Sequence, residues 1–325
     1  MAAEVIVLDA RKEDNQALID LDQQCVMGGE IQLVFDRSPD FFARSLAYED
    51  FRMCVAEEGG TIIGVGGVTV KHLQVSGTRG RWAYFYDLRV SPTHRRRGLA
   101  GRIADFLVGA IRDAGISGAY SWVIEGNTAS ESFVERRGNI PFTRRALAVL
   151  SGSAGAEPHG FEQITERDEE VTSLLEATYR LYDFTPPWDP VTLNRTLDRL
   201  TPLGWQGLYG KRVRGRWAVC FGLWDYSQVT QVTFRGGEPE ARIRPFFLYP
   251  LGWRDPDTLM EGLSAAQAMI AATDGTLILP YAPGDPLSAF IPREALRVGM
   301  TMYVRVLARE EMQKDERVFI DPADL

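Results

Sequence analysis

A run of basic and small residues separates an apolar strand pattern from an apolar helix pattern. The run reads Ser-Pro-Thr-His-Arg-Arg-Arg-Gly-Leu-Ala-Gly over residues 91–101. Small residues at its end allow a close approach of the backbone to a ligand, and the first N–H groups of a helix have no partner within the helix. These N–H groups, the helix dipole and the arginines all favour a phosphate or diphosphate. The run therefore predicts an anion-binding turn.

Two common phosphate-binding motifs are excluded here. No Gly-Lys-Ser/Thr follows the turn, so it is not a Walker loop, and the Gly-x-Gly-x-x-Gly of a dinucleotide fold is absent. The simpler alternative is an ordinary arginine-rich helix start with a glycine turn.

The flanking patterns predict the elements that position this turn. Residues 82–90 alternate with period two and are apolar on both sides, which is typical of a central strand covered on both faces. Leu99, Ile103, Leu107 and Ile111 recur at helical spacing, and the pattern ends at Gly115. A strand, a basic turn and a helix are thus expected in succession.

The rest of the first half predicts an alternation of strands and helices. We expect a strand at 4–8, a helix at 11–25, a second helix opened by Ser38-Pro39, a hairpin of 51–57 and 61–71, a connection at 73–80, a strand at 119–125, a helix at 128–137 and a strand at 145–150.

The spacing Val90-x-Pro92-x-x-Arg95-x-x-Gly98-x-Ala100 resembles motif A of the GNAT superfamily of acyl-CoA-dependent N-acetyltransferases, over about residues 1–150. The resemblance implies the GNAT fold, an α/β fold with a mixed sheet. It also implies acetyl-CoA as co-substrate. The cradle residues would then be Arg95, Arg96, Arg97, Gly98, Leu99, Ala100 and Gly101.

The resemblance also implies contacts to the arm of CoA. Main-chain groups of Leu88, Arg89 and Val90 would pair with the pantetheine, and Asn127 would contact the arm, with Ser130 one helical turn further on. Leu88 and Val90 are equally well core residues, and Asn127 is equally well a helix cap.

The proton acceptor has two acidic candidates. Asp87 lies next to the expected thioester-binding residues, and Glu125 ends the expected fifth strand. Asp87 alternatively pairs with a basic side chain, and Glu125 is alternatively a solvated charge. Tyr86 is a further catalytic candidate or a pocket wall. GNAT proteins commonly place a tyrosine seven residues after the asparagine as an acid, but here that residue is Val134.

The second half repeats the plan without the anion-binding turn. A small-residue linker is expected at 151–159, and residues 160–325 predict a similar order of elements. The loop before the helix at 257–272, Pro-Leu-Gly-Trp-Arg-Asp-Pro over 250–256, lacks the arginine and glycine spacing. We predict two tandem GNAT-like domains, 1–150 for acetyl-CoA and a degenerate one that does not bind CoA; the alternative is an unrelated α/β lid.

A resemblance to particular groups within the superfamily rests on residues scattered along the chain. Four stretches resemble plant hookless-type and animal histidine N-acetyltransferase-like proteins: Leu-Arg-Val-Ser-Pro-x-His-Arg-Arg over 88–96, Asn127-x-Ala129-Ser130, Asp285-Pro286-Leu287 and Ile291-Pro292. The turn also resembles the mycobacterial enhanced-intracellular-survival acetyltransferases. No substrate follows from either resemblance.

Composition limits the function classes. The chain has 325 residues, a net charge of −8 and three cysteines, Cys25, Cys54 and Cys220, without metal-ligand spacing. We expect reduced buried thiols, no metal, no nucleic-acid partner and no membrane partner. No signal peptide or membrane span is recognisable, so we expect a cytoplasmic protein. We expect a monomer or a homodimer.

The acceptor site should lie between the first two helices and before the fourth strand. That places it at residues 28–37, with Glu30 and Asp36, and at residues 73–80, with Trp188, Trp205 and Trp224 as possible walls. The expected function is acetyl transfer to a primary amine of a small molecule or amino acid. Alternatives are a non-catalytic acyl-CoA-binding protein and a protein lysine acetyltransferase.

Overall fold

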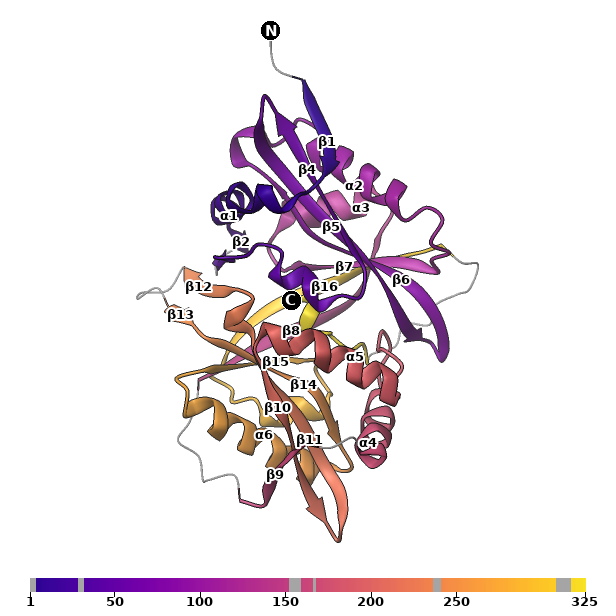
Figure 1. Ribbon diagram of the computed structural model, residues 1–325, viewed down its shortest axis with the longest axis vertical. Coiled ribbons are helices and arrows are strands. Elements are labelled where there is room, and N and C mark those ends of the chain that lie inside the picture. Colours follow the sequence, from indigo (N-terminus) through magenta and orange to yellow (C-terminus); the bar gives the residue numbers. More distant parts are fainter. Residues whose placement is uncertain (1–3, 29–31, 152–158, 166–167, 236–240, 308–316) are drawn as a thin grey trace.

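The computed structural model contains two lobes that share one twelve-stranded sheet (Figure 1). It describes residues 4–28, 32–151, 159–165, 168–235, 241–307 and 317–325. Along the sheet the strands follow the order β1-β4-β5-β6-β7-β16-β8-β15-β14-β11-β10-β9.

The first lobe is built around long antiparallel strands and three α-helices. Its elements are β1 (Val5–Asp9), α1 (Asn15–Gln24), the 3₁₀ helix η2 (Ala43–Ala47), β4 (Phe51–Glu58), β5 (Thr61–Val75), β6 (Thr78–Val90), α2 (Leu99–Ala110), β7 (Gly118–Ile124), α3 (Thr128–Arg136) and β8 (Ile140–Ser151).

The second lobe follows the same succession. Its elements are β9 (Phe161–Ile164), α4 (Glu169–Tyr179), α5 (Pro190–Leu200), β10 (Trp205–Val213), β11 (Arg216–Asp225), β14 (Pro245–Trp253), α6 (Pro256–Ala271), β15 (Thr276–Tyr281), η6 (Pro286–Phe290) and β16 (Leu296–Val306).

The two lobes repeat one topology. The order β1-β4-β5-β6-β7 in the first lobe corresponds to β9-β10-β11-β14-β15 in the second. In each lobe the last two strands of this series are parallel and are joined by a helix, α2 or α6, because parallel neighbours need a crossover connection. The fold is therefore a tandem arrangement of GNAT-like halves.

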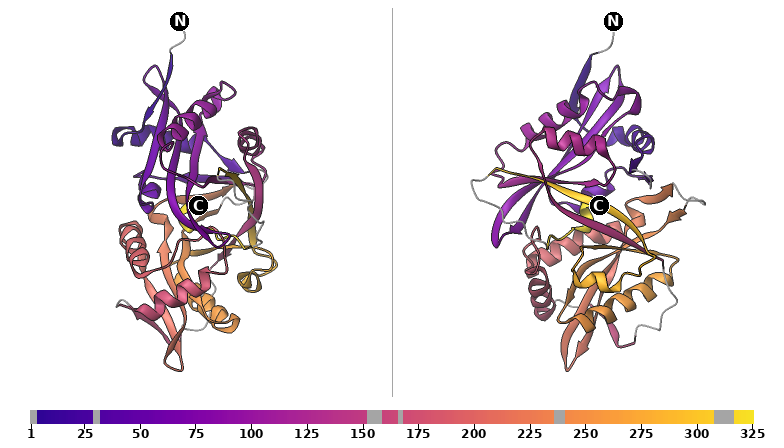
Figure 2. Two further views of the ribbon diagram at one scale, coloured as in Figure 1. Left: turned by 90° about the vertical axis from the view of Figure 1, so that its right-hand side faces the viewer. Right: turned by 180° about the vertical axis from the view of Figure 1, so that it is seen from behind.

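The end of each half completes the sheet of the other. β16, from the second half, lies between β7 and β8 and pairs with β7 from Met300 opposite Ile124 to Val306 opposite Gly118. β8, from the first half, pairs in turn with β15. Figure 2 shows β16 and β8 crossing the waist between the lobes. A second sheet also joins the halves through β3 (Gln32–Asp36) and β12 (Gln231–Arg235), with β2 (Met27–Gly28) and β13 (Ala241–Ile243) at its edges.

Helices cover both faces of the large sheet. One core runs through both halves and includes Leu18 of α1 and Leu175 of α4. On the other face, α2 packs through Ile103 over the first half and α6 packs through Leu263 over the second. Successive side chains of β11 point to opposite faces of the sheet. Cys220 therefore packs in the core that both halves share, and Phe221 packs in the core under α6.

Most predicted elements are confirmed, with three differences. The helix expected after Ser38-Pro39 is only the short η2, and β3, which precedes it, was not expected. The expected connection at 73–80 is a tight hairpin, in which Ser76 and Gly77 take positive φ. The expected loop at 250–256 is largely strand, because β14 continues to Trp253. The division at 151–159 stays a prediction, since residues 152–158 lie outside the described residues.

Candidate functional site

The first-half parallel strands separate soon after they meet. β6 and β7 pair only from Trp82 opposite Gly118 to Tyr84 opposite Tyr120. Beyond Tyr84, β6 continues to Val90 and keeps its antiparallel partner β5 on the other side. The edge of β6 that faces β7 is therefore free of strand partners over its last residues, and main-chain groups there can pair with an extended ligand.

A bulge reshapes β6 within this open stretch. The register with β5 shifts between Val65 and Gly67, and Asp87 takes φ +53°, a conformation that non-glycine residues rarely adopt. As a result the Leu88 side chain is 37% exposed, whereas Asp87 and Arg89 are buried. The bulge thus places an exposed Leu88 beside two buried charges.

The N-terminus of α2 is open to a ligand. Gly98 precedes the helix with φ +77°, and the N–H of Arg102 donates to its carbonyl at 3.2 Å. Helix geometry then leaves the N–H groups of residues 98–101 pointing out of the helix start. A methyl group placed on Gly98 or Gly101 would have no heavy atom within 4 Å, so the space there is open. Gly98 also permits the left-handed turn.

The three predicted cradle arginines differ in their contacts. Arg97 forms a two-pronged pair with Glu58 at 3.0 and 2.5 Å, and His94 lies 3.4 Å from the same carboxylate. Arg95 is exposed, donates through Nε to the carbonyl of Val90 at 3.4 Å and interacts with the thiol of Cys25. Arg96 is exposed and takes φ +62°. Arg95 and Arg96 are therefore better placed than Arg97 to neutralise an anion.

Asp87 lies at the centre of a buried ion cluster. Arg37 binds its carboxylate with two hydrogen bonds of 2.5 and 2.8 Å, and Arg44 and Arg89 contact it at 2.8 and 2.9 Å. Asp22 pairs with Arg89 and Arg37. Although burial opposes ionisation, the three guanidinium groups hold the pKa of Asp87 well below its usual range. The contacts fit the alternative that Asp87 pairs with Arg89 and other basic side chains, and so low a pKa makes its carboxylate a weak base near neutral pH.

A second carboxylate, which sequence reasoning missed, lies at the point where β6 and β7 separate. Asp324 accepts a hydrogen bond from Tyr120 at 2.8 Å and pairs with Lys71 at 2.8 Å, and its main-chain carbonyl accepts from Tyr84 at 2.6 Å. Burial raises its pKa to about 6, with repulsion from Asp321 adding to the rise and Lys71 opposing it. This is a carboxylate whose pKa suits proton transfer near neutral pH.

Among the hydrogen bonds and ion pairs of the described residues, none links Tyr86 or Glu125 to Asp324. Tyr86 shares a hydrogen bond of 2.9 Å with Ser45, and burial raises the pKa of its hydroxyl well above the usual range. It stacks on Tyr84, which fits the alternative of a pocket wall. Glu125 is exposed after β7, with its N–H bound to the carbonyl of Gly299 at 2.9 Å.

The predicted pair on α3 acts as a helix cap. The side chain of Asn127 accepts from the N–H of Ser130 at 3.3 Å, at the first turn of the helix. Their contact with the arm of CoA stays a prediction. Val134 has no titratable side chain, and its main-chain carbonyl accepts a hydrogen bond from the side chain of Asn139.

The expected acceptor segment connects the halves. β3 pairs along β12, and the side chain of Arg37 that follows it belongs to the ion cluster of Asp87. Asp36 accepts from the N–H of Ser38, and Glu30 lies outside the described residues. Trp188 and Trp224 are buried in the shared core, and Trp205 packs against it.

Two further observations bear on the kind of site. In the described stretches, no group of three or more His, Cys, Asp or Glu side chains is arranged to hold a metal ion. Among the helices in those stretches, none combines the length and apolar character that crossing a membrane requires. All three cysteines are free and buried.

Comparison with protein families gives one match, in the first half. Residues 15–138 match the family model described as Acetyltransferase (GNAT) family. The matched stretch includes β6, the basic turn and α2, which are the elements that form the open site. No curated protein sequence gives a significant match, so the resemblance to hookless-type and histidine N-acetyltransferase-like proteins stays a prediction.

Solved structures share the fold of the whole chain. N-myristoyltransferase from Saccharomyces cerevisiae with bound myristoyl-CoA is 10% identical, with a TM-score of 0.68 over 98% of this chain and 82% of that one. A GCN5-related N-acetyltransferase from Anabaena variabilis is 14% identical, with a TM-score of 0.56 over 93% and 73%. A glucosamine N-acetyltransferase region of a fungal multi-domain β-N-acetylglucosaminidase is 12% identical, with a TM-score of 0.65 over 93% and 38%. At these identities the likeness concerns the fold.

Proposed function

We propose that this protein is an acetyl-CoA-dependent N-acyltransferase that modifies a primary amine of a small molecule or amino acid. The observation that carries the proposal is the open edge of β6, which leads directly into the uncapped start of α2. An extended arm with a diphosphate at one end and a reactive thioester at the other matches such a site. The family match to residues 15–138 supports the same class.

The chain offers a partner for each polar part of CoA. The N–H groups of residues 98–101 and the side chains of Arg95 and Arg96 would hold the diphosphate. Main-chain groups of residues 88–90 would pair with the pantetheine and orient the thioester carbonyl, because β7 has already separated from β6 there. The buried ion pairs of Asp87 and Arg89 fix the bulge on which this orientation depends.

Asp324 is the best-placed acceptor for the amine proton. In the reaction the amine nitrogen bonds to the thioester carbon, the carbon–sulfur bond breaks, and the nitrogen loses a proton. Asp324 would take that proton, directly or through one water, because it is ionised above about pH 6 and lies at the vertex between β6 and β7. Tyr120, Tyr84 and Lys71 hold it there and act as positioning residues.

The leaving group needs little help. A thiol has a pKa of about 8.5, so its thiolate is a tolerable leaving group near neutral pH. An acid that protonates it would add roughly 10²-fold. The replacement of the family's usual tyrosine by Val134 is therefore compatible with turnover.

Thiol release tests the proposal. The protein is mixed with acetyl-CoA and a panel of small amines and amino acids, and free thiol is followed with a chromogenic disulfide. Amine-dependent release and an acetylated product by mass spectrometry are expected. Acetyl-CoA binding by calorimetry without release across the panel would favour a non-catalytic acyl-CoA-binding protein. A mass shift confined to protein lysines would favour a protein acetyltransferase.

A further inference from the structure

A second opening between parallel strands lies in the other half of the molecule. β14 and β15 pair only at Pro245 opposite Thr276 and Phe246 opposite Leu277, and then separate. The space between them contains a cavity with a volume of about 50 Å³. One water needs about 10–15 Å³ by this measure, so a small organic molecule fits.

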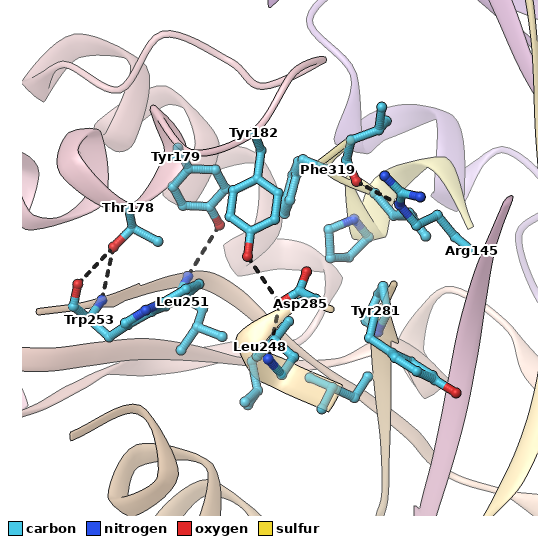
Figure 3. Close-up of a pocket in the computed structure, with 16 residues that line it drawn as sticks. Arg145, Thr178, Tyr179, Tyr182, Leu248, Leu251, Trp253, Tyr281, Asp285 and Phe319 are labelled. Carbon is cyan, nitrogen blue, oxygen red and sulfur yellow. Dashed lines mark hydrogen bonds between the residues drawn. The ribbon is translucent and has the colours of Figure 1, made fainter. Parts of the chain in front are cut away.

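The walls of this cavity are largely aromatic. Tyr179 and Tyr182 reach it from α4 and its end, Trp253 from β14, Tyr281 from β15, and Phe319 from the segment that covers the opening. Figure 3 shows Tyr179, at the end of α4, pointing toward Leu251 of β14, and Tyr182, just after the helix, pointing toward Asp285. Aromatic faces carry partial negative charge and attract organic cations.

One carboxylate faces the cavity with half of its acceptor capacity unused. Asp285 is 9% exposed, and both hydrogen bonds to its side chain from the described residues end on Oδ1, from Tyr182 at 3.1 Å and from the N–H of Leu287 at 3.0 Å. Oδ2 accepts none of them. An acceptor without a described partner in such a lining favours a ligand that brings its own N–H donors.

Among the described residues that line the cavity, Arg145 is the one arginine, and oxygens of the chain orient it. Arg145 donates to the carbonyls of Val318 at 3.1 Å and Arg144 at 2.8 Å and to the hydroxyl of Thr143 at 2.5 Å. Burial raises the pKa of Asp285, and the charges of Arg145 and Arg317 partly oppose this rise. Oδ2 of Asp285 is therefore an acceptor in the lining to which none of the described residues donates.

From this geometry we propose that the second half binds a small primary ammonium ion in this cavity, with the nitrogen at Oδ2 of Asp285 and the carbon chain against the aromatic walls. The cavity lies at a different strand opening from the one between β6 and β7, because β7, β16, β8 and β15 stand between the two openings. The segment that lines the cavity through Pro322 continues to Asp324 at the first opening. The proposal does not depend on acyl transfer.

The ligand's charge is tested with three probes of similar size. Calorimetry at pH 8 without CoA compares n-propylammonium, propan-1-ol and propionate. We expect propylammonium to bind at least about tenfold more tightly than propan-1-ol, because a charge-assisted contact exceeds a neutral one. Equal affinities, or tighter binding of propionate, would overturn the proposal.

Matched variants place the binding in the cavity rather than in the first half. Asp285→Asn should abolish the preference for propylammonium, whereas Asp257→Asn, at an exposed position on α6, should keep it. If both variants bind like the wild type, the cavity is not the site. Should Asp285→Asn not fold, Leu287→Phe replaces it: it fills the cavity and leaves Asp285 in place, so unchanged binding in that variant would equally reject the proposal.

Discussion

The two halves share a topology but differ at the ends of their parallel strands. In the first half, β6 carries a bulge with Asp87 and Arg89 and leads into a helix that begins at Gly98 with unpaired N–H groups. In the second half, β14 is buried at every position, and α6 begins with Pro256 behind a capping box of Asp255 and Thr258. One helix start is open to an anion, and the other already holds a carboxylate of its own.

The comparison shows how one fold supports two kinds of site. A helix start capped by aspartate repels a phosphate and has fewer N–H groups to offer, because the cap and the proline each remove one. The second opening keeps its space but lacks the cradle, so it suits a ligand without phosphate. In the proposed function, sequence differences over a few residues at a loop decide which half binds CoA.

The largest expected effect comes from breaking the ion cluster of the first half. Asp87→Ala leaves three buried guanidinium groups without their shared partner and should lower the free energy of unfolding by about 3–5 kcal/mol. Urea denaturation measures this, with Asp20→Ala on the exposed face of α1 as the control. Because folding lowers the pKa of Asp87, its stabilisation is present above its unfolded pKa and is lost as the pH falls through the lower, folded value. A loss similar to that of the control would show that the cluster does not stabilise the bulge.

Next in size is the loss of the proposed proton acceptor. Asp324→Asn keeps the shape but cannot take a proton, and we expect kcat/KM for the amine to fall about 10²–10³-fold with little change in acetyl-CoA affinity. Asp321→Asn removes the same charge from the same lysine without touching Tyr120 and should cost less than about tenfold. Equal losses in the two variants would assign Asp324 a structural role only.

The arginines of the cradle should affect binding rather than chemistry. The double variant Arg95→Ala, Arg96→Ala should raise the Kd for acetyl-CoA by about 10–100-fold, because both side chains are exposed and solvent screening leaves each contact with about 1 kcal/mol. The matched control is Arg254→Ala, just before α6 in the second half, where Arg254 contacts Glu170 and the Trp217 carbonyl. Calorimetry at low salt measures both. A larger effect in the second half would reverse the assignment of the two helix starts.

The pH profile gives an independent view of Asp324. Burial raises its pKa to about 6, so below that pH it is protonated and cannot accept the amine proton. We expect kcat/KM to fall about tenfold per pH unit below about 6, and Asp324→Asn to lose this inflection. An inflection unchanged in that variant would belong to another group.

The smallest effect is expected at the capped helix. Asp255→Ala removes the capping box of α6 and should lower the free energy of unfolding by about 1 kcal/mol. Acetyl-CoA affinity should not change, because the second-half helix start is not a phosphate site. A gain of a second CoA-binding site in this variant would show that the cap alone had excluded the ligand.

Local patterns were sufficient to predict much of the fold. The central strand, α2 and the basic turn follow from apolar periodicity and from the Arg-x-x-Gly-x-Ala spacing, and the absence of that spacing before α6 is also local. The exchange of β16 and β8 between the halves was not predictable, because both are ordinary apolar strands and only tertiary packing decides their neighbours.

The site was predictable only in part, because local patterns reveal its continuous segment but not the groups that tertiary packing brings to it. The cradle is one continuous segment, whereas the carboxylate at the vertex comes from Asp324, 204 positions after Tyr120, with which it shares a hydrogen bond. Asp87 is adjacent in sequence to the expected thioester contacts, but three arginines from separate segments determine its charge state. The signal that would have identified Asp324 is the acidic Asp-Pro-Ala-Asp run at 321–324, which is unusual for a buried segment.

A crystal structure with acetyl-CoA tests the central claim most directly. The account predicts one molecule per chain, with its diphosphate on the N–H groups of residues 98–101 and its thioester carbonyl at residues 88–90 of β6. A diphosphate at the start of α6, or an empty turn at 95–101 with CoA bound elsewhere, would contradict it.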